Sequence, residues 1–268
     1  LGETLKSQRH WLNDFQHIAE LGASVVMRAE NRGKGVYVLN LYGSALRTMG
    51  RLDEAADVLE RARLLGEESD NTSAGSASLT NMGNVLLDQG RFDEALTAYW
   101  EDVRISRESD PPHRFNEAIA LSNIGAALGK AGRYAEAIPH LRQSLSIRRD
   151  ISDAPGIASA SKNLGGALIG LGRQQNSPQH LREAIEVLRE AAEIYQQRRN
   201  KSSSADVANN VGQAQCMLGQ FREGILNLRF ALDYFEQTDQ TDLAAQVRED
   251  IAGYEEVAAR RQGRRGGQ

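Results

Sequence analysis

The stretch LSNIGAALGKAGRYAEAIPHL, residues 121–141, contains two glycines seven residues apart, Gly125 and Gly132. Apolar residues recur at helical spacing on both sides of Gly132, and Glu136 follows it at the start of the next segment. A glycine after a helical run favours a left-handed C-cap, and an acidic residue favours the first turn of a helix. The stretch therefore predicts two amphipathic helices joined by a tight turn.

The same glycine pair occurs five times in the chain, always with a spacing of seven residues. The pairs are Gly43/Gly50, Gly83/Gly90, Gly125/Gly132, Gly165/Gly172 and Gly212/Gly219. Successive first glycines are 40, 42, 40 and 47 residues apart, and the last interval holds seven additional residues. The segment RQQNSPQHLREA suggests that these residues lengthen the turn of the fourth copy. A fixed period near 40 residues is typical of stacked helical hairpins.

The first glycine of each pair lies inside a predicted helix, where it costs roughly 1 kcal/mol relative to alanine. Its recurrence indicates a compensating close approach of the partner helix. The small residues expected to match these glycines are Ala55, Ala95, Ala137, Ala184 and Gly224.

The repeated pattern resembles the tetratricopeptide repeat (TPR) over about residues 34–237. An apolar residue precedes each first glycine, at Tyr42, Met82, Ile124, Leu164 and Val211. A large residue follows each matching small residue by four positions, at Leu59, Tyr99, Leu141, Leu188 and Leu228. Two positions depart from the pattern: Asp102 replaces the usual alanine, and Pro139 predicts a kink early in the second helix of the third copy. The resemblance implies an all-α fold, a right-handed α-solenoid (TPR superhelix) of five helical hairpins with an N-terminal helix and a C-terminal capping helix.

The repeat boundaries follow from this assignment. The predicted organisation is an N-terminal helix at 1–33, repeats at 34–71, 72–112, 113–153, 154–201 and 202–238, and a capping helix with a basic tail at 239–268. The N-terminal stripe is expected to be the second helix of a truncated preceding repeat and comprises Trp11, Phe15, Ile18 and Val25. The capping stripe comprises Leu243, Val247, Ile251 and Tyr254. Because the chain begins with Leu1, we expect it to be part of a longer protein.

Asparagine recurs two residues before the first glycine in four of the five copies. Asn81, Asn123, Asn163 and Asn210 occupy this position, and Leu41 takes it in the first copy. Successive residues of a helix are rotated by about 100°, so this position and Asn84 lie on the side of the helix opposite its predicted core residues. In a repeat superhelix that opposite side lines the concave groove. An amide both donates and accepts, so a column of amides can bind the backbone of an extended peptide. The resemblance supports this, since peptide-binding members of the family carry asparagine here; the alternative is that these amides bond a neighbouring helix or face solvent.

Other candidate groove residues have no dominant charge. They are Tyr37, Ser44, Arg47, Lys130, Lys162, Asp206 and Gln213. The carboxylate-clamp members of the family use a cluster of basic residues, and no comparable cluster occurs here. We therefore expect an internal or composite peptide surface rather than a chain-terminal carboxylate as the target.

The composition excludes several classes of function. With a formal charge of −4 there is no global attraction to nucleic acid or to an anionic membrane, and no apolar run is long enough to cross a bilayer. The five histidines are dispersed, Cys216 is alone, and every glycine pair is explained by the repeat, so no metal site, nucleophile or phosphate loop is predicted. We expect a cytoplasmic, non-enzymatic protein without a cofactor, whose partner is a protein or peptide segment.

The long period and the turns at Ser69-Asp70 and Ser109-Asp110 also resemble the C-terminal repeat region of bacterial signalling ATPases of the STAND (NB-ARC-type) class. That resemblance implies a sensor or regulatory region attached to a nucleotide-binding domain. The alternative is a structural module that assembles with itself, or packs within its own protein, and binds no free peptide.

Overall fold

The computed structural model describes residues 32–69 and 72–265, and this part of the chain consists of eleven α-helices without a strand. The all-α expectation is therefore confirmed. The chain divides into two compact units, residues 1–127 and 128–268, and the division falls inside helix α6 (Arg114–Lys130). The predicted N-terminal stripe from Trp11 to Val25 lies outside the described residues.

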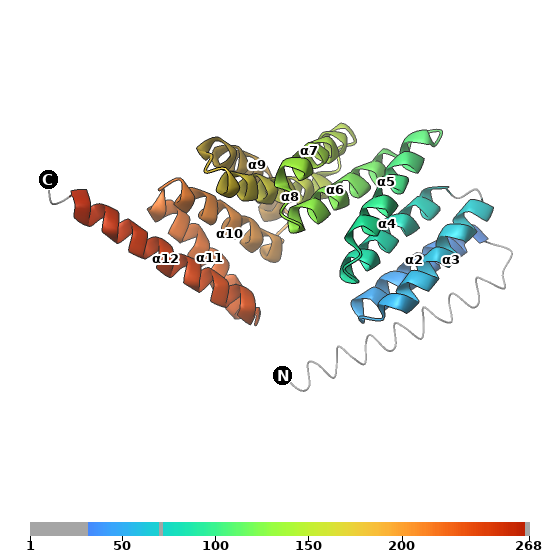
Figure 1. Ribbon diagram of the computed structural model, residues 1–268, viewed down its shortest axis with the longest axis horizontal. Helices are drawn as coiled ribbons and strands as arrows, with labels where there is room; N and C mark the ends of the chain where they lie inside the picture. The colour runs from blue at the N-terminus through green and yellow to red at the C-terminus, as the bar shows by residue number, and fades with distance from the viewer. Residues whose placement is uncertain (1–31, 70–71, 266–268) are drawn as a thin grey trace. The chain divides into compact units, whose positions relative to one another are not determined.

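Unit 1 contains two complete helical hairpins. Helices α2 (Arg32–Thr48) and α3 (Leu52–Glu68) form the first, and α4 (Thr72–Asp88) and α5 (Phe92–Glu108) form the second. Helix α4 packs against both α2 and α3, so the hairpins stack side by side (Figure 1). This is the arrangement of an α-solenoid, in which each repeat buries its apolar face on its neighbour.

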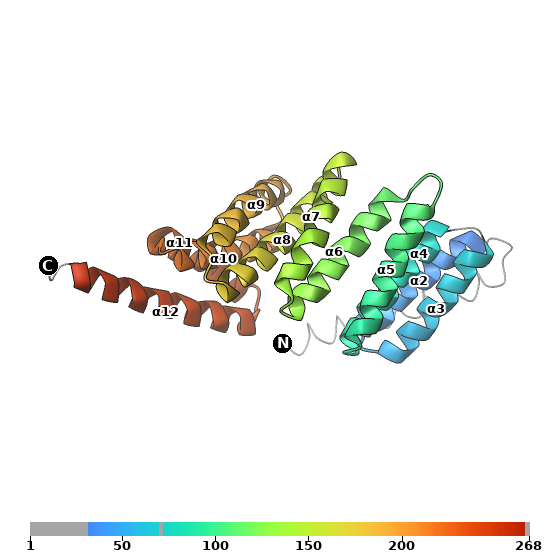
Figure 2. The same ribbon diagram turned by 45° about the horizontal axis from the view of Figure 1, so that its top comes forward.

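Unit 2 continues the same alternation. Its helices are α7 (Tyr134–Asp150), α8 (Ala154–Gln174), α9 (Pro178–Gln197), α10 (Lys201–Met217), α11 (Phe221–Gln237) and α12 (Thr241–Arg265). Helices α8 and α9 pair as one hairpin, α10 and α11 as the next, and α9 packs on α10 (Figure 2). Helix α7 runs through Pro139 without interruption.

The second glycine of a pair ends the first helix of the hairpin. Gly50 has a φ of 75°, the N–H of Gly50 donates to the carbonyl of Arg47 at 3.0 Å, and the N–H of Arg51 donates to the carbonyl of Leu46 at 2.9 Å. This closure requires a left-handed residue, which glycine adopts without strain. The same positive φ occurs at Gly90, Gly132 and Gly219.

The fourth repeat differs from the prediction. The seven additional residues do not lengthen the turn, which has three residues as in the other hairpins; instead α8 has 21 residues and α9 has 20, where the other paired helices have 17. Gly172 consequently lies within α8, and Asn176 takes the left-handed position with a φ of 49°. Additions of four and three residues are each close to one helical turn, so both helices keep their buried faces.

The first glycine of a pair lies against a large side chain of the partner helix, and in the fifth repeat the predicted small residue is also confirmed, because a Cβ at Gly212 would lie 2.8 Å from the carbonyl oxygen of Gly224. A Cβ at Gly43 would lie 2.5 Å from Cγ of Leu59, and one at Gly83 would lie 2.4 Å from Cε1 of Tyr99. Leu188 faces Gly165 in the same way. The missing side chain of the glycine therefore leaves room for a large residue of the partner helix, which lies four positions after the small residue that was expected to match the glycine.

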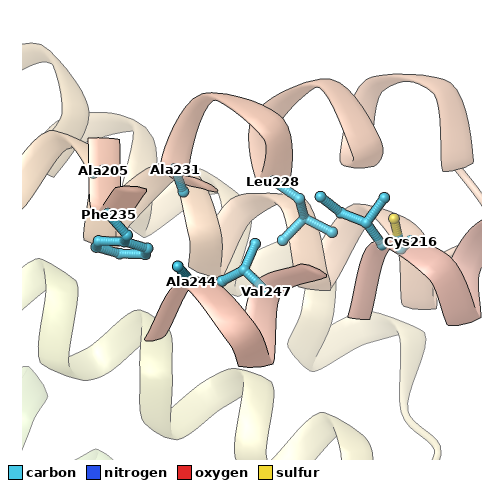
Figure 3. Close-up of a cluster of buried hydrophobic side chains, with 8 residues drawn as sticks. Ala205, Cys216, Leu228, Ala231, Phe235, Ala244 and Val247 are labelled. Atoms are coloured by element: carbon cyan, nitrogen blue, oxygen red, sulfur yellow. The ribbon is translucent and has the colours of Figure 1, made fainter. Parts of the chain in front are cut away.

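The last helix caps unit 2. Ala244, Val247 and Ile251 of α12 join a buried cluster with Leu228 and Phe235 of α11 (Figure 3). Ala244 replaces the predicted Leu243, which is exposed. The cluster extends to Cys216 of α10, so α10, α11 and α12 share one core.

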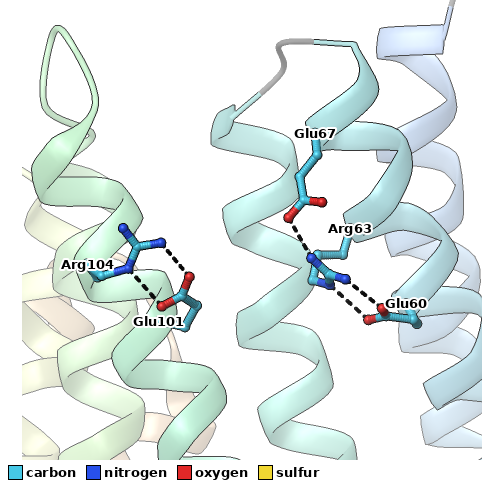
Figure 4. A network of polar contacts seen from close by, with 5 residues as sticks. All are labelled: Glu60, Arg63, Glu67, Glu101 and Arg104. Atoms are coloured by element: carbon cyan, nitrogen blue, oxygen red, sulfur yellow. Dashed lines mark hydrogen bonds and ion pairs between the residues drawn. The ribbon is translucent and has the colours of Figure 1, made fainter.

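Exposed ion pairs cover the second helices of unit 1. Arg63 bonds Glu60 at 2.6 Å and Glu67 at 2.5 Å, and Arg104 bonds Glu101 at 2.6 Å (Figure 4). Such pairs at a spacing of three or four residues stabilise a helix by about 0.2–0.5 kcal/mol each. These ion pairs stabilise the helical conformation of α3 and α5 on their exposed sides, where burial of apolar residues contributes little.

Candidate functional site

In unit 1, the predicted amides do not share one environment. Asn81 donates from Nδ2 to Oδ1 of Asn40 at 3.4 Å, and Asn40 donates to the carbonyl of Ala74 at 3.0 Å. Asn84 instead accepts a 2.7 Å hydrogen bond from the hydroxyl of Tyr99. Asn84 is thus directed toward α5, its own hairpin partner, while Asn81 links α4 to α2.

The other unit 1 candidates lie along α2. Tyr37 is 60% exposed and Leu41, one turn later, is 55% exposed. Ser44 is half-buried, and Arg47 forms an ion pair with Asp88 of α4 at 2.9 Å. The charge of Arg47 is therefore neutralised within the protein, whereas Tyr37 and Leu41 present an apolar surface.

In unit 2, the charged candidates pair with one another. Nζ of Lys162 on α8 lies 2.8 Å from Oδ2 of Asp206 on α10. Gln213 of α10 accepts from Arg173 of α8 at 3.4 Å and donates to Asp250 of α12 at 3.2 Å. These contacts link the neighbouring helices α8, α10 and α12 side chain to side chain. Lys130, at the end of α6, is exposed.

Three amides remain without a partner. Asn123 on α6, Asn163 on α8 and Asn210 on α10 are half-buried, and within the described ranges their side chains make no hydrogen bond. Asn163 follows Lys162 directly, and Asn210 lies one turn after Asp206, so the 2.8 Å bridge holds the two helices of unit 2 side by side near these amides. Here Lys162 and Asp206 neutralise each other, while the amides of Asn163 and Asn210 have no hydrogen-bond partner among the described residues.

Two features bear on metal binding and on nucleophilic chemistry in the described residues. No cluster of His, Cys, Asp and Glu there could hold a metal ion. Cys216 is buried, and desolvation raises the pKa of its thiol to about 11, which keeps it protonated at neutral pH. None of the described helices is long and apolar enough to cross a membrane.

Asp102, which stands where the repeat usually has alanine, forms a buried polar cluster that the sequence did not predict. Its side chain accepts hydrogen bonds from Ser76 and Thr80 of α4, and from Ser106 of α5 at 3.2 Å. Desolvation raises the pKa of Asp102 to about 6, and the hydroxyl donors oppose this rise. The corresponding residues of the other repeats are small and fully buried: Ala62, Ser144, Ala191 and Ala231.

Comparison with known proteins identifies the repeats. A tetratricopeptide repeat family model matches residues 36–101 and 116–190, and a second tetratricopeptide repeat model matches residues 80–150. The chain is 28% identical over 138 residues to the regulatory protein AfsR of Streptomyces coelicolor. That match covers 52% of this chain and 13% of AfsR, so the chain spans only a small part of this relative.

Two solved structures show the same fold. BtubC (BKLC) from P. vanneervenii superimposes with a TM-score of 0.69 at 15% identity, covering 91% of this chain and 93% of BtubC. The Rap conjugation gene regulator of plasmid pLS20, solved in complex with the Phr* peptide, superimposes with a TM-score of 0.60 at 17% identity. That match covers 82% of this chain and 59% of the regulator. Because the first family model matches more than half of the chain, the protein belongs to the tetratricopeptide repeat family.

Proposed function

We propose that this chain is a non-enzymatic scaffold that binds a partner segment in extended conformation along the first helices of its repeats. The observation that carries the proposal is the set of unpartnered amides at Asn163 and Asn210, next to the paired charges Lys162 and Asp206. An extended peptide has unpaired backbone N–H and C=O groups, and a side-chain amide complements both. The Phr* peptide complex of the structurally similar Rap regulator supports a peptide as the class of ligand.

Unit 1 supplies a second candidate surface of the same kind. Asn81 and Asn123 lie on α4 and α6, and Tyr37 and Leu41 are exposed on α2. Backbone-directed amides give affinity that tolerates sequence variation, while exposed apolar side chains select for apolar residues in the ligand. We therefore propose that the partner segment is uncharged or weakly charged and carries apolar side chains.

Removing the two amides of unit 2 tests this function. Random peptides displayed on phage are selected on the parent chain, and the affinity of each selected peptide is then measured for the Asn163→Ala/Asn210→Ala variant. We expect affinity to fall about tenfold to a hundredfold, the scale of one or two lost hydrogen bonds. The free energy of unfolding should change by less than about 0.5 kcal/mol, because neither amide is bonded within the protein.

Gln197→Ala is the matched control, since it removes an exposed amide from the second helix α9. It should bind the selected peptides as the parent does. Equal binding by the double variant contradicts the proposed surface, and a large loss of stability would make the two asparagines part of the scaffold instead.

We further propose that the chain is the sensor or regulatory part of a larger signalling protein. The similarity to a segment of the regulatory protein AfsR supports this, and a STAND-type nucleotide-binding domain in the complete protein is the expectation. The test is nucleotide hydrolysis by the complete protein with and without a selected peptide. An unchanged hydrolysis rate, or a complete protein without such a domain, contradicts the regulatory role.

The alternative function is a structural module that assembles with itself or packs within its own protein. A specific observation favours it: Leu226 and Phe230 of α11 are 72% and 57% exposed. These residues lie on the second helix α11, whereas Asn163 and Asn210 lie on the first helices α8 and α10, so different side chains carry the two functions.

A further inference from the structure

Ion pairs join neighbouring helices of unit 2 on both sides of the junction between α9 and α11. Arg142 and Arg149 of α7 bond Glu183 and Glu190 of α9, at 2.5 and 2.6 Å. On the other side of the unit, α11 is joined to α12 by Arg229 with Glu255 at 2.8 Å and by Glu236 with Arg248 at 2.5 Å.

The junction between α9 and α11 is open. A groove of about 500 Å³ lies there, with α10 contributing Val207, Ala208 and Val211 to its lining. Phe230 of α11 lines the groove, and Leu226 lies one turn earlier on the same helix. The one charged residue of the lining, Arg189, pairs with Glu186 at 2.8 Å, so the groove offers an apolar surface without a free charge.

The exposed face of α11 has a specific charge order. Arg222, Leu226, Phe230 and Asp233 follow one another at spacings of four, four and three residues, which places them on one side of the helix. This side is opposite the core residues Gly224, Leu228, Ala231 and Phe235. In the described part of the chain, Arg222 and Asp233 belong to no ion pair, unlike Arg229 and Glu236 of the same helix.

From this order we infer that α11 is the contact between two copies of this chain. A second copy packed antiparallel about a two-fold axis between Leu226 and Phe230 brings each Leu226 opposite the other copy's Phe230. The same operation brings each Arg222 opposite the other copy's Asp233, because the two charges lie at opposite ends of the apolar pair. Such a contact is isologous, and the α9/α11 groove receives the apolar side chains of the second copy.

The exposed face of α11 fits a second copy better than an unrelated helix, because both its charges and its apolar residues are complementary to those of an antiparallel copy. The helix carries the cation and the anion that an antiparallel copy requires, and neither belongs to an ion pair in the described residues, although Asp233 accepts a 2.8 Å hydrogen bond from the side chain of Gln237. Leu226 and Phe230 lie next to the groove that would receive the same residues of the second copy. Together with the groove they form one contiguous apolar patch rather than isolated exposed residues. Helix α10 contributes to both surfaces, but the dimer contact is centred on Leu226 and Phe230 of α11 and the proposed peptide site on Asn163 and Asn210, so separate substitutions test the two proposals.

The molar mass of the chain in solution tests the inference. Light scattering after size-exclusion chromatography, and sedimentation equilibrium over a series of concentrations, should show a monomer–dimer equilibrium. The Leu226→Glu/Phe230→Glu variant should raise the dimer dissociation constant by about tenfold or more, since charges would replace the central apolar contacts. Leu64→Glu, a change of an exposed leucine on α3 of unit 1, is the matched control and should dimerise as the parent does.

Charge reversal tests the antiparallel arrangement. Arg222→Asp and Asp233→Arg should each weaken the dimer by roughly threefold to tenfold, and the double reversal should restore it, because the exposed pairs are modest in energy. Both substitutions are at exposed positions, and thermal unfolding checks that the variants are folded. A monomer at every concentration, an unaffected Leu226→Glu/Phe230→Glu dimer, or a double reversal that dimerises no better than the single ones would overturn the inference. The Asn163→Ala/Asn210→Ala variant should keep the parental mass, which separates this test from that of peptide binding.

Discussion

Replacing Gly165 with alanine is expected to lower the free energy of unfolding by roughly 1–3 kcal/mol, while alanine at the adjacent Gly166 raises it by up to about 1 kcal/mol. A Cβ at Gly165 would lie 2.4 Å from Cγ and 2.6 Å from Cδ2 of Leu188. Leu188 is fully buried, so it has no free space into which to move. At Gly166 a Cβ would meet no atom within 4 Å, so the substitution changes stability only through the higher helix propensity of alanine.

Urea unfolding followed by far-UV circular dichroism measures both variants under one set of conditions. A double-mutant cycle with Leu188→Ala identifies the clash: the loss caused by alanine at position 165 should shrink once Leu188 is truncated. Equal effects of the two glycine substitutions, or a Gly165→Ala effect that does not depend on Leu188, would show that contact with Leu188 is not the reason for a glycine at position 165. Because a Cβ at Gly83 would lie 2.4 Å from Cε1 of Tyr99, a similar loss of stability is expected for Gly83→Ala.

The second large effect concerns Asp102 and pH. The pKa of Asp102 is raised from its usual 3.8 to about 6, so the folded state binds the proton more tightly than the unfolded state does. The resulting stabilisation is complete below about pH 3.8 and is lost as the pH rises through 6. At 1.36 kcal/mol per pKa unit, the total change is about 3 kcal/mol.

Asp102→Asn removes this titration while keeping the shape of the side chain. The amide can accept from Ser76 or Ser106 and donate to the hydroxyl of Thr80, because hydroxyl groups serve in either role. We expect Asp102→Asn to be more stable than the parent near pH 8, and the difference to shrink by about 3 kcal/mol toward pH 3.5. Comparing the two chains across the same pH series cancels the other carboxylates, several of which have lowered pKa values and act in the opposite direction.

Chemical unfolding of both chains from pH 3.5 to pH 8 gives the measurement. Ser144→Ala is a useful control, because Ser144 is the small buried residue at the corresponding position of the third repeat and does not titrate. A parent and an Asp102→Asn curve that run parallel over the whole pH range would mean that Asp102 titrates normally. That result would contradict the effect of burial described above.

The hairpins could be predicted from the sequence because their signals are local. A glycine such as Gly50 ends a helix through its own backbone conformation, and the apolar stripe of each helix repeats every 3.6 residues regardless of what lies beside it. Five copies in phase gave the period near 40 residues and a close helix approach at the first glycine, whereas the contact of a large side chain such as Leu59 with Gly43 came from the structure. For the same reason the prediction of an all-α solenoid needed no knowledge of the contacts between repeats.

The proposed recognition surface could be predicted only in part. Its residue types and helices follow from the asparagines at a fixed position in four repeats. The sequence does not show which amides lack a partner. Asn84 bonds Tyr99 and Asn81 bonds Asn40, and these pairs are 15 and 41 residues apart in the chain. The bridge between Lys162 and Asp206, 44 residues apart, is of the same kind.

The sequence by itself determined the all-α class, the turns at Gly50, Gly90, Gly132 and Gly219, and the apolar face of each repeat helix, since all three depend on residues within about one helical turn of one another. Only the tertiary structure decided that the seven additional residues of the fourth repeat lengthen α8 and α9, that Asp102 is held by three hydroxyl groups, and that a groove opens between α9 and α11. These features depend on how close one helix lies to another that is distant in the chain. Packing sets that distance, and no local pattern encodes it.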